Sequence, residues 1–431
     1  MSNSVEFIST DIGDYPKSWE IKKIKVLGEI ITGTTPSTKK QEYYNGNIPF
    51  IAPGDMSDIK YIKITQKTLS EKGLSVSRSL PKDSVLVVCI GATIGKTGMT
   101  FEEISVTNQQ INSIIPNSNI DPHYIYYALS FRSKDLPSLA SRAAIPIVNK
   151  SNFSEFRIPL PSLEEQKKIS LVLSSIQKTI QKVSNVIKSV FELKKSLLHH
   201  LFTYGPVPID QRHAVELQET ALGLLPKEWE AKKIGELFDI VQGKSLNKKT
   251  KDGPNQLPFL RTSNVFWSKI KLPIIDKMHF SEEQEEKFKL EKDDLLVCEG
   301  GAVGRTAIWN NEIELCMCQN HIHRLRTTNP DIIPKFYMYW LEYTISLKNM
   351  YISAANWTTI PNLSKSRLNN FIVPVASKDN QIMVCDILTK TDKKIESEVN
   401  KKNSLEELFK TLLEKLMTGQ IRVNDFNLEE I

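Results

Sequence analysis

The chain has 431 residues, which is too long for one ordinary hydrophobic core and indicates two or three domains. Its 40% hydrophobic and 25% charged residues are typical of a soluble protein, and no apolar run approaches membrane-spanning length. The 56 basic and 50 acidic residues give a formal charge of +6, which permits DNA binding without requiring it. The first residues lack a basic region followed by an apolar one, so we expect a cytoplasmic protein.

The region 1–160 mixes short apolar runs with turn signals, for example in "KVLGEIITGTTPS", "NIPFIAPGDM" and "SVLVVCIG". These runs predict short strands in an α+β domain. Within it, "VLVVCIGATIGKTG" at 85–98 has the look of a nucleotide-binding loop. A P-loop needs four residues between its first glycine and Gly-Lys-Ser/Thr, however, and Gly91 is one residue too close to Gly95.

The region 161–203 changes to a helical pattern. Apolar residues alternate spacings of four and three, as in the a/d seam of a coiled coil: Ile169, Leu173, Ile176, Ile180, Val183, Ile187 and Val190. Leu197 and Leu201 continue this seam past Lys194. We expect a helix over about 163–202, roughly 60 Å long at about 1.5 Å per residue.

After a linker at 204–223, the chain repeats itself. "TDIGDYPKSWE" from Thr10 returns as "TALGLLPKEWE" from Thr220 at an offset of 210, and "VCIGATIGKTG" from Val88 returns as "VCEGGAVGRTA" from Val297 at an offset of 209. "NQQIN" matches "QNHIH" at an offset of 211, and from "IPIVNKS" onward the offset is 215. The chain is therefore two tandem copies of a unit of roughly 200 residues.

The repeat weakens two alternative interpretations. The lysine of the suspected nucleotide loop, Lys96, corresponds to Arg305 in the second copy. At the offset of 209 the second loop is as short as the first, so both copies depart from a P-loop in the same way. A zinc site was the second possibility, since "CMCQNHIH" holds Cys316, Cys318, His321 and His323. Structural zinc sites usually take ligand pairs from separated segments, and the first copy has no such residues at these positions. The chain has five cysteines, an odd and scattered number that argues against a disulfide framework.

The second copy has a mixed region at 224–375, a second helix at 376–418 and a tail at 419–431. Its seam is less regular, with apolar positions at Val384, Leu388, Ile395, Leu405, Phe409, Leu412 and Leu416. Thr391, Glu398 and Lys402 interrupt it, and a seam shifted through Val399 is equally possible. We expect the two long helices to pair with each other as an antiparallel coiled coil. The alternative is that each packs back on its own mixed domain.

At this point the sequence resembles the specificity subunits of type I restriction-modification systems. The resemblance is carried by the twin "PKSWE" and "PKEWE" openings, the "GATIGK" and "GGAVGR" loops, the "IPLPSLEEQKKI" helix entry and the "LLEKLMTGQIRV" ending. It covers essentially the whole chain, twice. The second helix entry departs from the pattern, because "VASKDNQ" replaces "LPSLEEQ", and the motif therefore does not predict the local turn there.

The resemblance implies a DNA reader that has no catalysis of its own. Each mixed region would be a target-recognition domain that reads half of a bipartite, asymmetric site in double-stranded DNA, and the helices would set the spacer. Two methyltransferase subunits would dock on the chain and methylate adenine at N6, and two restriction subunits would complete a nuclease. S-adenosylmethionine, ATP and Mg are expected on those partners, and neither a cofactor nor a metal on this chain. No membrane partner is implied.

Sequence readout uses Arg or Lys for guanine and Asn or Gln for adenine, while further cations contact phosphates. The candidates in the first copy are Lys39, Lys40, Arg78, Lys96, Asn108, Gln109 and Gln110. Those in the second are Lys244, Lys248, Lys249, Lys251, Arg261, Arg305, Gln319, Asn320, Arg324 and Arg326. The glycine-flanked Lys96 and Arg305 are the strongest of these, although a purely structural loop explains them equally well.

Two other classes of function compete with this one. An enzyme is disfavoured because the chain has no Asp/Asn-Pro-Pro-Tyr/Phe methylation motif, no P-loop and no recurring nuclease motif. A coiled-coil scaffold without sequence-specific DNA binding is the second, and co-purification with a methyltransferase would separate it from a DNA reader.

Overall fold

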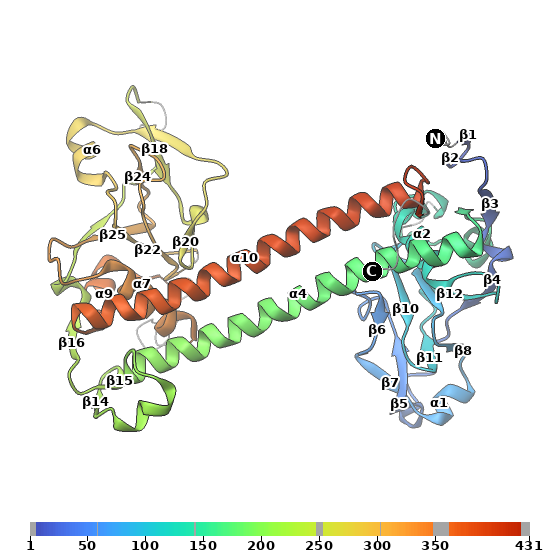
Figure 1. The fold of residues 1–431 in the computed structure, drawn as a ribbon, viewed down its shortest axis with the longest axis horizontal. Coiled ribbons are helices and arrows are strands. Elements are labelled where there is room, and N and C mark those ends of the chain that lie inside the picture. Colours follow the sequence, from blue (N-terminus) through green and yellow to red (C-terminus); the bar gives the residue numbers. More distant parts are fainter. Residues whose placement is uncertain are drawn as a thin grey trace. The chain divides into compact units, whose positions relative to one another are not determined.

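The computed structural model describes residues 6–57, 59–141, 144–246, 253–301, 303–347 and 362–423. Its contacts divide the chain into two compact units. Unit 1 is Met1–Ser184 with Lys401–Ile431, and unit 2 is Asn185–Asn400, so each unit contains one mixed region and a part of both long helices (Figure 1).

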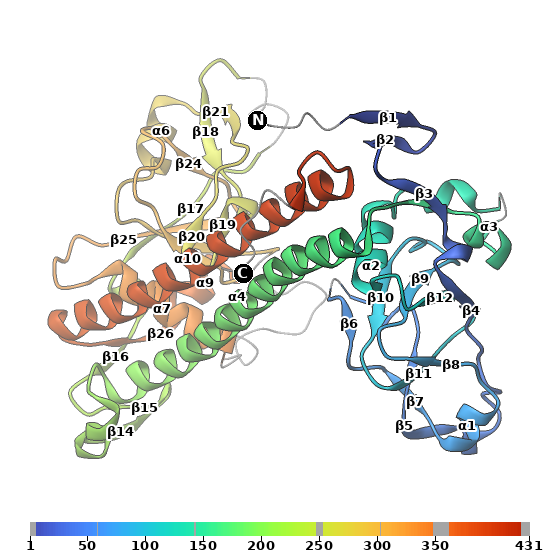
Figure 2. The ribbon, with the colours of Figure 1, turned by 45° about the vertical axis from the view of Figure 1, so that its right-hand side comes forward.

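Two sheets form the mixed region of unit 1. In spatial order, the first contains β4 (Gly28–Thr32), β12 (Ile111–Pro116), β9 (Val85–Val88), β10 (Thr97–Thr100) and β6 (Tyr61–Ile62). The second contains β7 (Lys67–Leu69), β5 (Tyr44–Ile51), β11 (Ile104–Thr107) and β8 (Ser79–Pro81). Figure 2 shows β4, β12 and β9 as neighbours in the first sheet. The central strands β9 and β10 are buried along their whole length, and β12 is buried over its first four residues, so both faces of the first sheet are covered at its centre.

Unit 2 repeats this arrangement. Its first sheet contains β17 (Asp239–Gln242), β25 (Ile322–Arg326), β22 (Leu295–Cys298) and β23 (Thr306–Ile308), and its second β21 (Asp276–His279), β18 (Gln256–Leu260) and β24 (Met317–Cys318). These occupy the positions of β4, β12, β9 and β10 and of β7, β5 and β11. At the place of the unit 1 edge strand β6, unit 2 has a hairpin of β19 (Val265–Phe266) and β20 (Lys269–Ile270).

Shorter elements complete each unit. In unit 1 they are the pair β1 (Phe7–Thr10) and β2 (Gly13–Pro16), the pair β3 (Glu20–Lys23) and β13 (Arg157–Leu160), and the helices α1 (Glu71–Ser75), α2 (Pro122–Phe131) and α3 (Lys150–Ser154). In unit 2 they are β14 (Leu217–Thr220) with β15 (Gly223–Pro226), β16 (Glu230–Lys233) with β26 (Ile372–Val375), α6 (Glu282–Phe288), α7 (Pro334–Leu341), a π-helical turn (Glu342–Leu347) and α9 (Lys365–Asn369).

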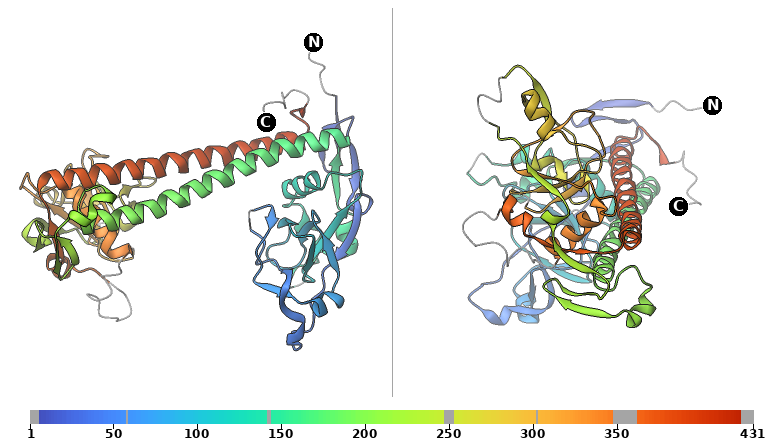
Figure 3. Two further views of the ribbon diagram at one scale, coloured as in Figure 1. Left: turned by 60° about the horizontal axis from the view of Figure 1, so that its bottom comes forward. Right: turned by 90° about the vertical axis from the view of Figure 1, so that its left-hand side faces the viewer.

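The two long helices are α4 (Leu163–Tyr204) and α10 (Lys378–Met417). In unit 1 the beginning of α4 packs against the end of α10, through Ile169 and Leu173 on one side and Leu416 and Met417 on the other. In unit 2 the end of α4 packs against the beginning of α10, through Leu201 and Leu388 among others. The helices therefore run antiparallel, and they lie side by side within each unit (Figure 3). This confirms the expected α+β fold with a pair of antiparallel long helices.

The expected alternative, packing of each helix on its own mixed region, occurs together with this pairing. In unit 1, Ile169 and Leu173 share a core with Tyr124 and Ile125 of α2. In unit 2, Leu388 shares a core with Phe336 and Tyr337 of α7. Both arrangements are possible because each helix presents an apolar stripe wide enough for two neighbours.

The seam residues differ in their burial. In α4, Ile169, Leu173 and Val183 are buried, and the others are half-buried: Ile176, Ile180, Ile187 and Val190. In α10, Leu388 and Ile395 are buried, whereas Leu405 and Leu412 are half-buried. Glu398 and Val399 are both half-buried, so burial does not distinguish the two possible seams there.

The same capping turn starts both helices. Ser162 Oγ accepts from Glu165 N at 3.3 Å, and Ser377 Oγ accepts from Asn380 N at 3.3 Å. The side chain four residues after each serine is a buried glutamine that bonds the mixed region: Gln166 accepts from Asp121 N at 3.0 Å, and Gln381 from Ile333 N at 2.9 Å. The divergent "VASKDNQ" sequence therefore keeps the turn, because Ser and Gln supply its hydrogen bonds.

Candidate nucleic-acid interface

The glycine loop that resembles a nucleotide site is the turn of a β-hairpin. In unit 1, Val88 N donates to Lys96 O and Gly95 N donates to Val88 O, both at 2.9 Å, and β10 follows directly. Gly95 has φ +93°, and a Cβ there would lie 2.4 Å from Ser133 O, so a side chain cannot be placed at this position. A P-loop ends in a helix N-terminus that receives the phosphate, and here a strand takes that place.

The matching loop of unit 2 is one residue shorter than that of unit 1. Cys298 N donates to Arg305 O and Gly304 N to Cys298 O, both at 2.8 Å, so Cys298 occupies the position of Val88. Likewise Cys89 N donates to Gln110 O and Glu299 N to His321 O, both at 2.8 Å. The residues of the first hairpin strand therefore correspond at an offset of 210. Gly95 still corresponds to Gly304, and Lys96 to Arg305, at an offset of 209.

The prediction of equally short loops, which paired Cys89 with Cys298, was wrong for a physical reason. The apolar residues of a buried strand are interchangeable in a sequence comparison, so the identical Val-Cys pairs aligned one residue out of register. A shift of one residue turns every side chain to the other face of a sheet, and only the hydrogen-bond ladder determines it.

The cysteine and histidine cluster of unit 2 is part of the sheet framework. Cys316 and Cys318 are buried, and burial raises the pKa of each thiol to about 12. The buried His323 lies with Nε2 2.8 Å from Leu363 O, and burial lowers its pKa. Over the described ranges no three His, Cys, Asp or Glu side chains are grouped as metal ligands would be.

In unit 1 several of the predicted DNA contacts gather around the segment that follows β4. Arg78 Nη1 donates to Thr32 O at 2.9 Å, and Thr35 Oγ1 donates to Gln109 Oε1. Asn108 Nδ2 donates to Gln110 Oε1 at 2.9 Å in the turn between β11 and β12. The structure thus brings Arg78 and the amides of 108–110 to one edge of the domain.

Within the described residues, the candidate lysines of unit 1 form no side-chain hydrogen bond with these amides. Lys39 is exposed, while Lys40 Nζ lies 3.1 Å from Tyr43 Oη, a hydrogen bond that raises the pKa of Lys40. Lys96 is half-buried, and its side chain forms no ion pair with another described residue.

In unit 2 the equivalent edge is formed by the segment after β17 and the turn between β24 and β25. Asn320 N donates to Lys244 O at 3.0 Å, and Gln242 Nε2 donates to Asn320 O at 2.9 Å. The half-buried Gln319 lies in the same turn. Lys244 Nζ is turned inward, 2.5 Å from both His279 O and Gln284 Oε1, and burial lowers its pKa. Lys248, Lys249 and Lys251 lie outside the described residues.

The arginines of unit 2 divide into paired and unpaired groups. Arg324 is 5% exposed and bonds Asp239 Oδ2 at 3.1 Å, and Arg326 bonds the buried Asp294 at 2.7 and 2.8 Å. Arg261 Nε lies 2.7 Å from Asp276 Oδ2 on the surface. Arg305 has no carboxylate partner among the described residues, and its guanidinium lies 5.0 Å from the centre of the Phe266 ring. The geometry assigns Arg324 and Arg326 to structural ion pairs, since one member of each pair, Arg324 or Asp294, is buried and would lose its partner.

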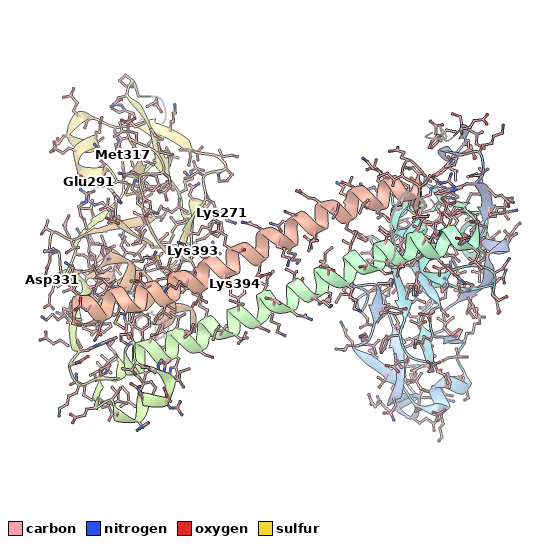
Figure 4. All side chains as sticks on the ribbon, in the orientation of Figure 1. Lys271, Glu291, Met317, Asp331, Lys393 and Lys394 are labelled. Carbon is pink, nitrogen blue, oxygen red and sulfur yellow. The ribbon has the colours of Figure 1, made fainter. Side chains whose placement is uncertain are left out.

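A cleft of about 1060 Å³ lies within unit 2, between its mixed region and α10. Its basic lining residues include Lys194, Lys269, Lys271, Lys292 and Lys393, and Figure 4 labels two of these, Lys271 and Lys393. Glu342 pairs with Lys194 and Glu396 with Lys269. In the described part of the chain, no ion pair compensates Lys271, Lys292 or Lys393. Sequence reasoning missed this group, although the two aromatic residues followed by two lysines in "FWSKIK" are a signal for it.

These features define a class of protein: a twofold internal repeat in which two similar α+β domains, with different charged groups at equivalent loops, are joined by two long helices. The family model described as "Type I restriction modification DNA specificity domain" matches residues 16–190 and 226–407. The chain belongs to this family of type I restriction-modification specificity subunits. No helix in the described part of the chain is both long and apolar enough to cross a membrane.

Individual relatives agree over the whole length. The MjaIX specificity subunit of Methanocaldococcus jannaschii is 27% identical over 433 residues, which cover 97% of each chain. The HindI specificity subunit of Haemophilus influenzae is 39% identical over 197 residues, covering 43% of this chain and 41% of that one. The crystal structure of the type I S subunit from M. genitalium has the same fold, with a TM-score of 0.59, 18% identity and coverage of 96% and 97%.

Proposed function

We propose that this chain directs a type I modification complex to a bipartite, asymmetric site in double-stranded DNA. The mixed regions 1–160 and 224–375 each read one half-site, and the long helices set the unspecified spacer between them. The observation that carries the proposal is the repeat itself: two domains with the same strand order present different side chains at equivalent loops, such as Lys96 and Arg305. Two different readers in one chain are what an asymmetric two-part site requires.

The chemistry of this proposal resides in the partners. Two methyltransferase subunits bind S-adenosylmethionine and methylate adenine at N6, and two restriction subunits with ATP and Mg add cleavage, as the family resemblance implies. The chain itself contributes no catalytic group. Burial supports this for its cysteines, because the pKa of Cys298 and Cys385 is raised to about 12 and that of Cys89 to about 11, which disfavours the reactive thiolate.

Mapping N6-methyladenine across the host genome with and without this gene tests the proposal. We expect one motif, made of two specified halves and an unspecified spacer, to disappear when the gene is deleted. An unchanged methylation pattern in cells that express the partner subunits would contradict the proposal and favour a scaffold without DNA specificity.

Substitution of the paired loop cations tests the assignment of the half-sites. Arg305→Ala should weaken binding through the half-site read by the second copy, and Lys96→Ala through that read by the first, while assembly with the methyltransferase is retained. Duplexes in which one half-site is scrambled distinguish the two effects in a salt-titrated binding assay. Unchanged affinity for Arg305→Ala would remove this residue from the interface.

A further inference from the structure

An aromatic ring in unit 2 holds two cations. The guanidinium carbon of Arg305 lies 5.0 Å from the centre of the Phe266 ring, and Lys271 Nζ lies 4.7 Å from the same centre. Both distances are within the range of a cation–π interaction. The two positive groups are therefore at most about 10 Å apart, although they come from distant segments of the sequence.

Backbone hydrogen bonds fix the positions from which these side chains extend. The buried Asn264 side chain accepts from Arg261 N at 2.9 Å and donates to Lys271 O at 3.0 Å, and Lys271 N donates to Asn264 O at 2.9 Å. Arg305 O accepts from Cys298 N at 2.8 Å at the end of the β22 and β23 hairpin. Phe266 itself belongs to none of the buried core clusters, so its ring is available for these cations.

Among the described residues, no carboxylate pairs with the two cations of this group. Nearby cations of unit 2 have acidic partners, Asp276 for Arg261 and Glu396 for Lys269. Over the described residues, neither Arg305 nor Lys271 is ion-paired with Asp or Glu. Two like charges within about 10 Å of each other repel, and an anion that contacts both relieves that repulsion.

The first copy has no equivalent ring. Ala52 N donates to Asp55 Oδ2 at 2.8 Å, in the same turn in which Arg261 N donates to Asn264 Oδ1. This turn aligns the two copies at an offset of 209 and places Ser57 at the position of Phe266. The aromatic group is therefore specific to the second recognition domain.

We propose that Phe266 positions Arg305 and Lys271 as a two-cation clamp for the DNA backbone, contacting the same phosphate or adjacent phosphates. Arg305 and Lys271 make the contacts, and Phe266 is a positioning residue that limits the conformational freedom of both side chains. This inference rests on the proposed DNA-reading function and adds to it a phosphate site that only the second copy has. A phosphate contact orients the domain without reading a base.

Salt titrations of DNA binding test the two cations. The full chain in complex with its methyltransferase partner is titrated with a duplex that carries the mapped site and with an unrelated duplex. Arg305→Ala and Lys271→Ala should each reduce the slope of log affinity against log salt by about 0.9, and each should weaken binding about 5-fold near physiological salt. The loss should be similar on both duplexes, because phosphates are common to both.

Substitutions of the ring test its positioning role. Phe266→Leu should weaken binding roughly 3- to 10-fold through the lost cation–π interactions, without changing the salt slope. Phe266→Tyr should keep the wild-type affinity, because it retains an aromatic ring. If Phe266 only filled apolar space, Phe266→Leu would bind as well as the wild type. In the Arg305→Ala background, Phe266→Leu should have a smaller effect.

Lys287→Ala is the matched control, because Lys287 also lies over a ring in unit 2, 5.6 Å from the centre of Phe288, and its removal changes the net charge equally. An equal decrease in slope for Lys287→Ala would attribute the effect to net charge and overturn the clamp. Unchanged slopes for both Arg305→Ala and Lys271→Ala, in a wild-type complex that binds its site selectively, would also overturn the clamp and leave the proposed function intact. Loss of selectivity in the wild-type complex would instead reject the proposed function.

Discussion

Lys194 is a buried cation at a seam position of α4. Its Nζ lies 2.7 Å from Glu342 Oε1 and 2.8 Å from Asp392 Oδ1, and 5.5 Å from the centre of the Tyr339 ring. The Lys194 side chain is 8% exposed, and that of Glu342 is 12% exposed. This one ammonium group joins α4, α10 and the mixed region of unit 2.

Replacing Lys194 by Ala leaves two carboxylates close together without their cation. Breaking a buried ion pair by removing one partner costs about 3–5 kcal/mol. Because Asp392 is 26% exposed and keeps some contact with water, we expect a loss near the lower limit, about 3 kcal/mol. For a domain the size of unit 2 this corresponds to a decrease of about 6–12 °C in the midpoint of thermal unfolding.

Tryptophan fluorescence mainly follows the unfolding of unit 2. Trp19 is in unit 1, whereas the other five of the six tryptophans are in the sequence of unit 2. Lys227→Ala is the control, since Lys227 and Glu216 form an ion pair with side chains 69% and 76% exposed. It should shift the midpoint by no more than about 2 °C.

The repeat provides a compensating variant. Tyr127 of unit 1 occupies the place of Tyr339. Around Tyr127, the places of Lys194, Glu342 and Asp392 are taken by Phe409, Ser130 and Gln177, respectively. Introducing these neutral residues together into unit 2 should restore at least half of the lost stability, because no unpaired charge remains. A midpoint lowered by less than about 2 °C in Lys194→Ala would refute the reasoning, since the pair would then behave as a surface ion pair.

Two further predictions concern unit 1. Burial lowers the pKa of Lys60 to about 8 from 10.5 in the free side chain. Between about pH 8 and 10.5 the unfolded chain binds more protons than the folded one, so the free energy of unfolding should rise with pH. In Lys60→Met, denaturant titrations should show no such rise. If the free energies of both proteins changed with pH in parallel, the prediction would be contradicted. Arg422 donates to the mostly buried Glu165 at 2.7 and 3.0 Å. Arg422→Ala should destabilise unit 1 by about 2 kcal/mol, as measured by hydrogen exchange, and a loss below about 0.5 kcal/mol would be inconsistent with this role.

Local periodicity and the internal repeat were sufficient to predict the architecture. The seam from Ile169 to Val190 predicted α4, because helix formation depends on side chains three and four positions apart in the same segment. The tandem copies predicted two similar α+β domains, and the matched openings placed Trp19 and Trp229 in equivalent positions.

The remaining features depend on contacts between distant segments, which periodicity does not encode. Only the strand ladder revealed that Cys89 matches Glu299. Only packing showed that Arg324 and Arg326 are held in ion pairs, whereas Arg305 has no carboxylate partner within the described ranges. The Phe266 ring meets Arg305 from another hairpin because the strand order brings them together. The sequence alone thus determined which elements form and that they form twice, whereas the tertiary structure decided which of the described charges form ion pairs, because those pairs join segments far apart in the sequence.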